Sequence, residues 1–94
     1  MLKCPCLILQ SNLFNSKSRT YIVVPILPEH KPNWPFVVNV KPSKQNMIDQ
    51  LRHLNLKQLR AVDISRFDKK LGQLEQSYFL QIKSVLLELF NLKD

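Results

Sequence analysis

Apolar residues gather along the first part of the chain in three stretches that are typical of β-strands. Residues 4–10, 19–27 and 34–40 are rich in β-branched, aromatic and other apolar side chains, and polar segments with Asn, Ser and Pro separate them. Pro25 has no backbone N–H, so we expect it at an edge, at a bulge or at the end of its strand. The pattern predicts three strands joined by loops.

The next strand is less sharply defined. Polar and apolar residues alternate along residues 53–62, which favours a fourth strand. Leu51, Leu54 and Leu59 nevertheless lie near helical spacing, so a helix remains the alternative. Residues 43–52, just before, predict a loop or a single helical turn.

Two short elements are expected next. Asp63 can accept a hydrogen bond from an early backbone N–H, which predicts a capped helical turn over residues 63–67. Residues 69–74 predict a short strand around Gly72, the one glycine of the chain.

The clearest periodic pattern lies at residues 75–90. Glu75 and Ser77 suit the start of a helix, through capping and through the helix dipole. Apolar residues then recur at three- and four-residue spacing, which predicts an amphipathic helix with a wide apolar face: Tyr78, Phe79, Ile82, Val85, Leu86, Leu89 and Phe90. We therefore expect an α+β fold, a small barrel-like sheet with one C-terminal helix, forming a single domain over residues 1–94.

The strand at residues 4–10 has almost no chain before it. Unpaired strand edges invite wrong pairing. We therefore expect this edge to be covered by a later strand, by another chain or by a segment upstream of residue 1.

Composition and charge limit the kinds of protein to which this chain can belong. The 94 residues are 45% hydrophobic and 22% charged, which is ordinary for one globular domain. Fourteen Lys and Arg against seven Asp and Glu give a net charge of +7. Such an excess favours contact with phosphate-bearing polymers, and an acidic protein partner would fit equally well.

The two cysteines carry little functional signal. Cys4 and Cys6 are one residue apart, too close for an unstrained disulfide, and no nearby His completes a zinc site. We expect small, partly buried thiols in a reducing cytosol. No apolar run reaches membrane-spanning length, so we expect a cytoplasmic protein without membrane contact, metal or cofactor.

Taken in order, these segments resemble the PemK/MazF family of toxin endoribonucleases, relatives of CcdB. Residues 5–10 (PCLILQ) resemble the family strand R-P-hydrophobic-L-V-I/L-Q, and residues 21–26 (YIVVPI) are similar to its next strand. Residues 55–63 (NLKQLRAVD) resemble the segment L-x-Q-I-R-T/A-I/V-D. The resemblance implies an SH3-like, CcdB/MazF-like fold, a homodimer, and an antitoxin partner with an acidic C-terminal tail.

Two departures from the family pattern bear on activity. The family opens with a further strand and a long loop that are not found upstream of residue 1, so the resemblance implies an N-terminally truncated member with the first strand missing. Its catalytic Arg and Thr positions hold Cys4 and Leu27 here. Metal-free cleavage through the ribose 2′-hydroxyl needs a cation and a hydroxyl near the phosphate, which these side chains do not supply. The resemblance therefore implies impaired cleavage with no intact catalytic residue.

Several basic, aromatic and amide side chains are candidates to hold single-stranded RNA by charge and stacking. For each candidate the alternative is a role without RNA, as a solvent-exposed rim residue, a core residue or a dimer contact. We expect Gln58 and Arg60 to lie on the same face of their strand. His30 and His53 are expected to be ordinary loop or surface residues. The RNA-binding candidates are Lys3, Lys17, Arg19, Trp34, Lys41, Lys44, Gln58 and Arg60.

Two other functions stay open. A noncatalytic protein could still dimerise and bind an antitoxin or RNA. A CcdB-like gyrase binder is less favoured, because its relatives depend on a C-terminal aromatic and residues 91–94 contain none.

Overall fold

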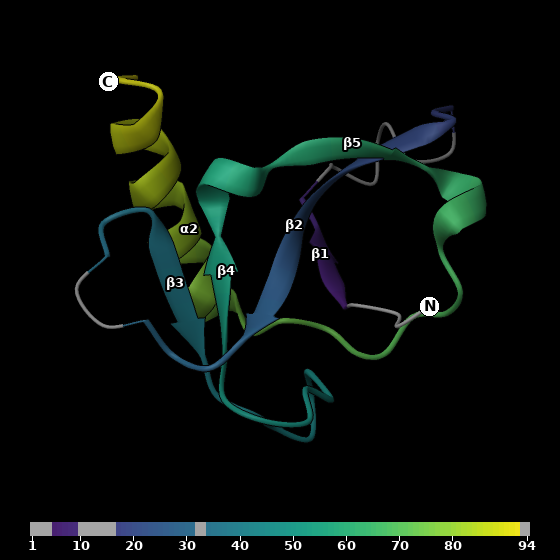
Figure 1. Cartoon of the computed structure of the whole chain (residues 1–94), viewed down its shortest axis with the longest axis horizontal. Coiled ribbons are helices and arrows are strands. Elements are labelled where there is room, and N and C mark those ends of the chain that lie inside the picture. The colour runs from purple at the N-terminus through teal and green to yellow at the C-terminus, as the bar shows by residue number, and fades with distance from the viewer. Residues whose placement is uncertain (1–4, 10–16, 32–33, 93–94) are drawn as a thin grey trace.

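A computed structural model describes residues 5–9, 17–31 and 34–92 of the chain. Within this part, five antiparallel strands form a bent sheet, and one helix packs behind β3 and β4 (Figure 1). The elements are β1 (Cys6–Ile8), β2 (Thr20–Pro28), β3 (Val37–Val40), β4 (Arg52–Asn55), η1 (Leu56–Gln58), β5 (Arg60–Asp63), η2 (Ile64–Arg66) and α2 (Gln76–Leu89). The expected α+β class with a C-terminal helix is confirmed, although the described sheet is not a closed barrel.

The long strand β2 organises the sheet. β1 pairs with it on one side, so a later strand covers one edge of β1, as expected. β5 pairs with the first half of β2 and β4 pairs with its end, and β3 lies outside β4. The strand order is β1-β2-β4-β3, with β5 beside β4 along β2.

Pro25 lies inside β2, at a point where the neighbouring ladder is interrupted. The Ile26 N–H donates to the Pro5 carbonyl, 3.0 Å away, on the β1 side. Because successive residues of a strand point their backbone groups to opposite edges, the nitrogen of Pro25 faces the other edge. The pairing of β5 ends there at Val23 and that of β4 begins at Ile26, so the missing N–H leaves no ladder bond unmade.

The segment predicted as one strand over residues 53–62 is two strands with a turn of 3-10 helix between them. The Asn55 side chain accepts a hydrogen bond from the Lys57 N–H at 3.0 Å and so caps this turn. Leu56 is 1% exposed, and its N–H donates to the Phe36 carbonyl at 3.0 Å. The continuous strand and the helix alternative were both wrong, because the turn rotates Leu56 into the core.

The expected turn at residues 63–67 is confirmed as η2. Asp63 Oδ1 accepts a hydrogen bond from the Ser65 N–H at 2.9 Å. This bond to the ionised carboxylate holds the pKa of Asp63 below its usual value.

The short strand predicted at residues 69–74 was wrong, because this segment enters none of the strand ladders. It is a connection to α2 without regular secondary structure, and the Gln73 N–H donates to the Gln45 carbonyl at 2.9 Å. It crosses the loop that follows β3 instead of joining the sheet.

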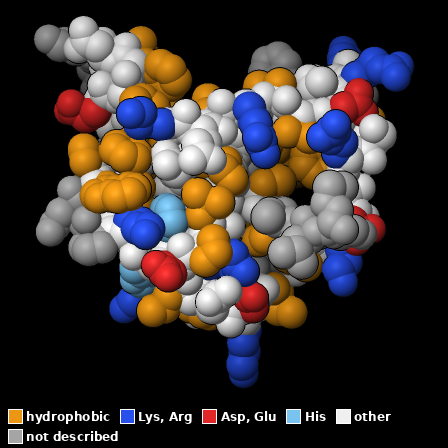
Figure 2. Space-filling view, in the orientation of Figure 1, with side chains coloured by type: hydrophobic (Ala, Val, Ile, Leu, Met, Phe, Trp, Pro, Cys, Tyr) orange, Lys and Arg blue, Asp and Glu red, His pale blue; other side chains and the backbone are white. Residues whose placement is uncertain are grey.

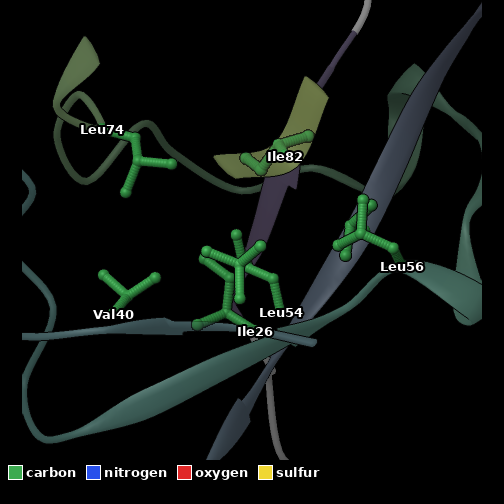
Figure 3. Packing of buried hydrophobic residues seen from close by; sticks show 8 residues of the cluster. Ile26, Val40, Leu54, Leu56, Leu74 and Ile82 are labelled. Atoms are coloured by element: carbon green, nitrogen blue, oxygen red, sulfur yellow. The ribbon is translucent and has the colours of Figure 1, made fainter. Parts of the chain in front are cut away.

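The core lies between the helix and the face of the sheet that it covers (Figure 3). Leu54 and Ile26 point toward Ile82 of α2, and Leu74 closes one side from the connecting segment. The predicted helix face is confirmed for most of its members, whereas Phe90 is 53% exposed. The buried core consists of Val24, Ile26, Val38, Val40, Leu54, Leu56, Leu74 and Ile82.

Residues 43–51 form a loop with a turn and no helix, as one of the two expectations had it, and Arg52 already belongs to β4. Glu75 lies at the N-cap position of α2, but its side chain does not cap the helix, which corrects the expected role. Its carboxylate accepts hydrogen bonds from Ser43 Oγ at 2.6 Å and from Asn46 Nδ2 at 3.0 Å. The loop after β3 is thereby fastened to the start of the helix.

Candidate functional site

Leu27, at one of the two positions singled out by the sequence, lies near the end of β2. Its cross-strand partner is His53 of β4, which in turn pairs with Asn39 of β3. Because Ile26 and Leu54 belong to the core, strand alternation puts these three residues on the face that α2 does not cover. The half-buried Leu27 therefore brings a hydrocarbon side chain to this face.

His53 is not the surface residue that we expected, because it is only 3% exposed. Its Nδ1 lies 2.8 Å from the Glu29 carbonyl oxygen. A carbonyl only accepts hydrogen bonds, so Nδ1 carries the proton and donates it. His30 is half-buried in its loop, with Nε2 3.2 Å from the Val40 carbonyl. The His30 and His53 rings thus each connect their own segment to the backbone carbonyl of another segment.

Arg52 is the cation beside Leu27 in the sheet, and it is engaged in an ion pair. Its Nε donates to Asp49 Oδ1 at 2.8 Å and its Nη2 to Asp49 Oδ2 at 3.2 Å, and Nη1 reaches the Ile26 carbonyl at 3.3 Å. Only 12% of the Arg52 side chain is exposed. The hydrogen bonds that Arg52 donates to the Asp49 carboxylate lower the pKa of Asp49. The Arg52 guanidinium is thus already bound by the Asp49 carboxylate and by the Ile26 carbonyl.

Cys4 and Lys3 lie outside the described residues, but Cys6 is half-buried on β1. Partial burial raises the pKa of the Cys6 thiol, and the charge of Arg60 opposes that effect. Arg60 is exposed on β5, across β2 from Cys6. A neutral thiol at this place offers neither cation nor base.

The RNA-binding candidates that the structure describes, which exclude Lys3, belong to several different elements and loops. Figure 2 shows Lys and Arg side chains spread around the visible face of the molecule. Lys17 and Arg19 precede β2, where the Ile64 N–H donates to the Arg19 carbonyl at 2.8 Å. Lys41 and Lys44 lie in the loop after β3.

Gln58 and Arg60 do not share a strand face, which corrects that expectation. Gln58 belongs to η1 and Arg60 begins β5, because the turn at Leu56 separates the two residues. Both side chains are exposed.

The structure adds partners around Trp34 that the sequence reasoning missed. The ring centroids of Trp34 and Phe36 are 5.4 Å apart. Lys31 Nζ lies 5.7 Å from the centroid of the Trp34 ring, and Lys57 Nζ lies 4.9 Å from that of Phe36. The closeness of residues 31, 34 and 36 in the sequence was a signal from which their proximity could have been predicted. Lys57 joins them only through the pairing of β3 with β4.

Over residues 5–9, 17–31 and 34–92, no three His, Cys, Asp or Glu side chains converge as a metal ion would need. In the same ranges, no helix is long and apolar enough to cross a bilayer.

A family model for the PemK-like, MazF-like toxins of type II toxin–antitoxin systems matches residues 2–90. The chain belongs to this family. No curated protein sequence matches it. The expected fold is confirmed by solved structures that share it at low sequence identity.

The Mycobacterium tuberculosis toxin MazF-mt6 is similar with a TM-score of 0.84 and 18% identity, over 97% of this chain and 89% of the other. An endoribonuclease in complex with its cognate antitoxin, from mycobacterial species, gives 0.80 and 18%, over 97% and 84%. A MazE–MazF structure from Deinococcus radiodurans gives 0.76 and 18%, over 96% and 84%. At such identity the likeness of these MazF-family structures establishes the fold alone.

Proposed function

We propose that this member of the MazF/PemK family binds single-stranded RNA but is impaired in the metal-independent cleavage through the ribose 2′-hydroxyl that its family resemblance implies. The observation that supports the proposal most directly is Leu27, whose hydrocarbon side chain stands where the resemblance requires a Thr hydroxyl. Cys4 likewise stands where the resemblance requires an Arg.

The chemistry explains why neither residue is an adequate substitute. Attack of a 2′-hydroxyl on phosphorus builds negative charge on the phosphoryl oxygens, which an Arg stabilises with a fixed pair of donors. A hydroxyl can donate a hydrogen bond or relay a proton, and an isobutyl group can do neither. The nearby His53 and Arg52 are already engaged, by the Glu29 carbonyl and by Asp49.

Restoring the two side chains tests this proposal. The double variant Cys4→Arg with Leu27→Thr is expected to cleave single-stranded RNA at least about 10²-fold faster than the unmodified chain, since each restored group supplies a term of that order. The measurement is fragment formation from a labelled RNA in the presence of EDTA. A matched control is Cys4→Lys with Leu27→Val, which supplies a cation without the fork or the hydroxyl.

Two results count against impairment. One is rapid, EDTA-resistant cleavage by the unmodified chain that copurifies with the protein through successive columns. The other is equal activity of the double variant and its control.

A second function from another class is supported by the basic character of the chain. A net charge of +7 suits an acidic antitoxin tail, and two of the similar structures are described as complexes with an antitoxin or as MazE–MazF. In this alternative the chain forms a homodimer in the cytoplasm and binds its antitoxin without cleaving RNA.

Light scattering and titration separate this alternative from the first proposal. A dimer mass, together with saturable binding of an acidic peptide from the cognate antitoxin, supports it. A monomer that binds RNA but not the peptide contradicts it.

A further inference from the structure

The loop between β2 and β3 presents an aromatic surface with a lysine on each side. Trp34 is 46% exposed and its ring packs at a tilt of 38° against Phe36. Lys31 lies over the Trp34 ring and Lys57 over the Phe36 ring. These four residues form a platform, and in Figure 2 hydrophobic surface flanked by Lys or Arg is visible on the side where β3 begins.

The platform is held in place by backbone and amide contacts. The Lys31 N–H donates to Asn39 Oδ1 at 2.8 Å, and Asn39 Nδ2 donates back to the Lys31 carbonyl at 3.4 Å. The Val37 N–H donates to the Trp34 carbonyl at 3.2 Å, which closes the turn that carries both aromatic rings.

Lys57 is fixed by a separate set of contacts. The Asn55 cap sets the turn that carries it, and the bond from Leu56 to the Phe36 carbonyl joins that turn to the aromatic pair. The pairing of Val37 with Asn55 brings the two segments together. The rings and the backbone beneath both lysines therefore need little ordering when a ligand binds.

The chemistry of the platform fits one class of ligand. Exposed aromatic rings stack on nucleic-acid bases, and flanking ammonium groups contact phosphates. An acidic peptide would pair with the lysines but leave the flat indole uncovered. We propose that the platform of Lys31, Trp34, Phe36 and Lys57 is a stacking site for a base of single-stranded RNA, with the two lysines on the adjacent phosphates. This inference rests on the proposed RNA binding of the chain.

Two acidic side chains border the platform and set its electrostatics. Glu29 Oε2 lies 3.6 Å from Lys31 Nζ, and 75% of the Glu29 side chain is exposed. Glu88 of α2 lies with Lys57 and Phe36 around a shallow hollow beside Pro35. Glu29→Gln is therefore expected to strengthen RNA binding, because it removes a charge that competes with phosphate for Lys31.

Trp34 is the one tryptophan of the chain, so its fluorescence reports on this site. The probe is a uridine decamer carrying 2′-O-methyl groups, which cannot be cleaved through the 2′-hydroxyl. We expect it to quench Trp34. In a labelled-RNA anisotropy assay, Trp34→Leu should weaken binding by about 5- to 150-fold, while Trp34→Phe keeps most of the affinity.

The lysines are tested by salt dependence. Lys31→Gln and Lys57→Gln should each lower affinity and reduce the slope of log affinity against log salt by about 0.7, as expected for one phosphate contact to a single strand. The matched control is Lys70→Gln, an exposed lysine in the segment before α2. It should leave both the slope and the quenching unchanged. Circular dichroism of each variant verifies that it is folded.

The outcomes separate this inference from the proposed function. If the unmodified chain binds no decamer in either assay, the proposed RNA binding fails. If it binds RNA and the Trp34 and lysine variants bind equally well, the platform is wrong while RNA binding stands. If a decaglutamate peptide quenches Trp34 and competes as well as the decamer does, the platform is an acidic-protein surface and the inference is also wrong.

Discussion

Gly72 lies where the segment leading into α2 crosses the loop after β3. A Cβ atom added there would lie 2.5 Å from the Gln45 carbonyl oxygen and 2.7 Å from the carbonyl carbon and oxygen of Asn46. Both neighbours are backbone, so the crowding cannot be relieved by turning a side chain. The sequence showed a lone glycine but not this close approach, because the residues that it meets are 26 and 27 positions earlier in the chain.

Gly72→Ala is expected to reduce the free energy of unfolding by about 1–3 kcal/mol, the usual cost of overpacking. The measurement is urea unfolding followed by Trp34 fluorescence. Gln73→Ala, at the adjacent exposed position, is the control and should stay within about 0.5 kcal/mol of the unmodified chain. Equal stability of Gly72→Ala and the unmodified chain would show that the two segments can separate freely.

The link between the loop after β3 and α2 depends on Glu75. Its carboxylate joins Ser43 and Asn46, and Asn46 is 5% exposed with its amide also donating to the Lys41 carbonyl at 3.0 Å. The hydrogen bond from Ser43, followed by that from Asn46, lowers the pKa of Glu75 from its ordinary value of 4.5. Sequence reasoning identified Glu75 as a cap because capping is local, whereas its actual partners are about 30 residues away.

This link makes a prediction for acid stability. Since the folded pKa is lower than the unfolded one, ionised Glu75 stabilises the fold above pH 4.5, and that contribution is lost as pH falls through the folded pKa. The stability difference between the unmodified chain and Glu75→Gln should therefore shrink on acidification. It is measured by urea unfolding at a series of pH values.

Ser43→Ala should weaken the same pH dependence, because it removes the main donor to the carboxylate. Glu88→Gln removes a carboxylate from the same helix that makes neither of these contacts, and should leave the dependence in place. A constant difference between the unmodified chain and Glu75→Gln at all pH values would contradict this account.

Across the whole molecule, a small core joins the sheet to one helix. Ile82 is 2% exposed and contacts the strand residues of this core from α2. For 94 residues the total free energy of unfolding is expected to be only about 5–14 kcal/mol. Loss of one large core side chain is therefore expected to be felt throughout the fold.

Ile82→Ala should cost about 2–5 kcal/mol, through lost burial and the cavity left behind. Helix content by circular dichroism and Trp34 fluorescence should decrease in one shared urea transition, because Trp34 lies next to β3, which α2 covers. Leu80→Ala, 62% exposed on the same helix, is the control and should change little. Separate transitions for the two signals would mean that α2 and the sheet unfold independently.

The sequence by itself determined the elements whose signals are local: the apolar face of α2, the strand composition of β1 to β3 and the Asp63 cap. It also carried the family motifs, and with them the prediction that Cys4 and Leu27 occupy the family's catalytic positions. Only the tertiary structure decided what depends on distant segments. The pairing of Val37 with Asn55 brought Lys57 to Phe36, the turn at Leu56 separated Gln58 from Arg60, and a break in the ladder accommodated Pro25. Spacing along the chain reports neighbours within a few residues, whereas strand register and backbone crossings are set by packing of the whole core.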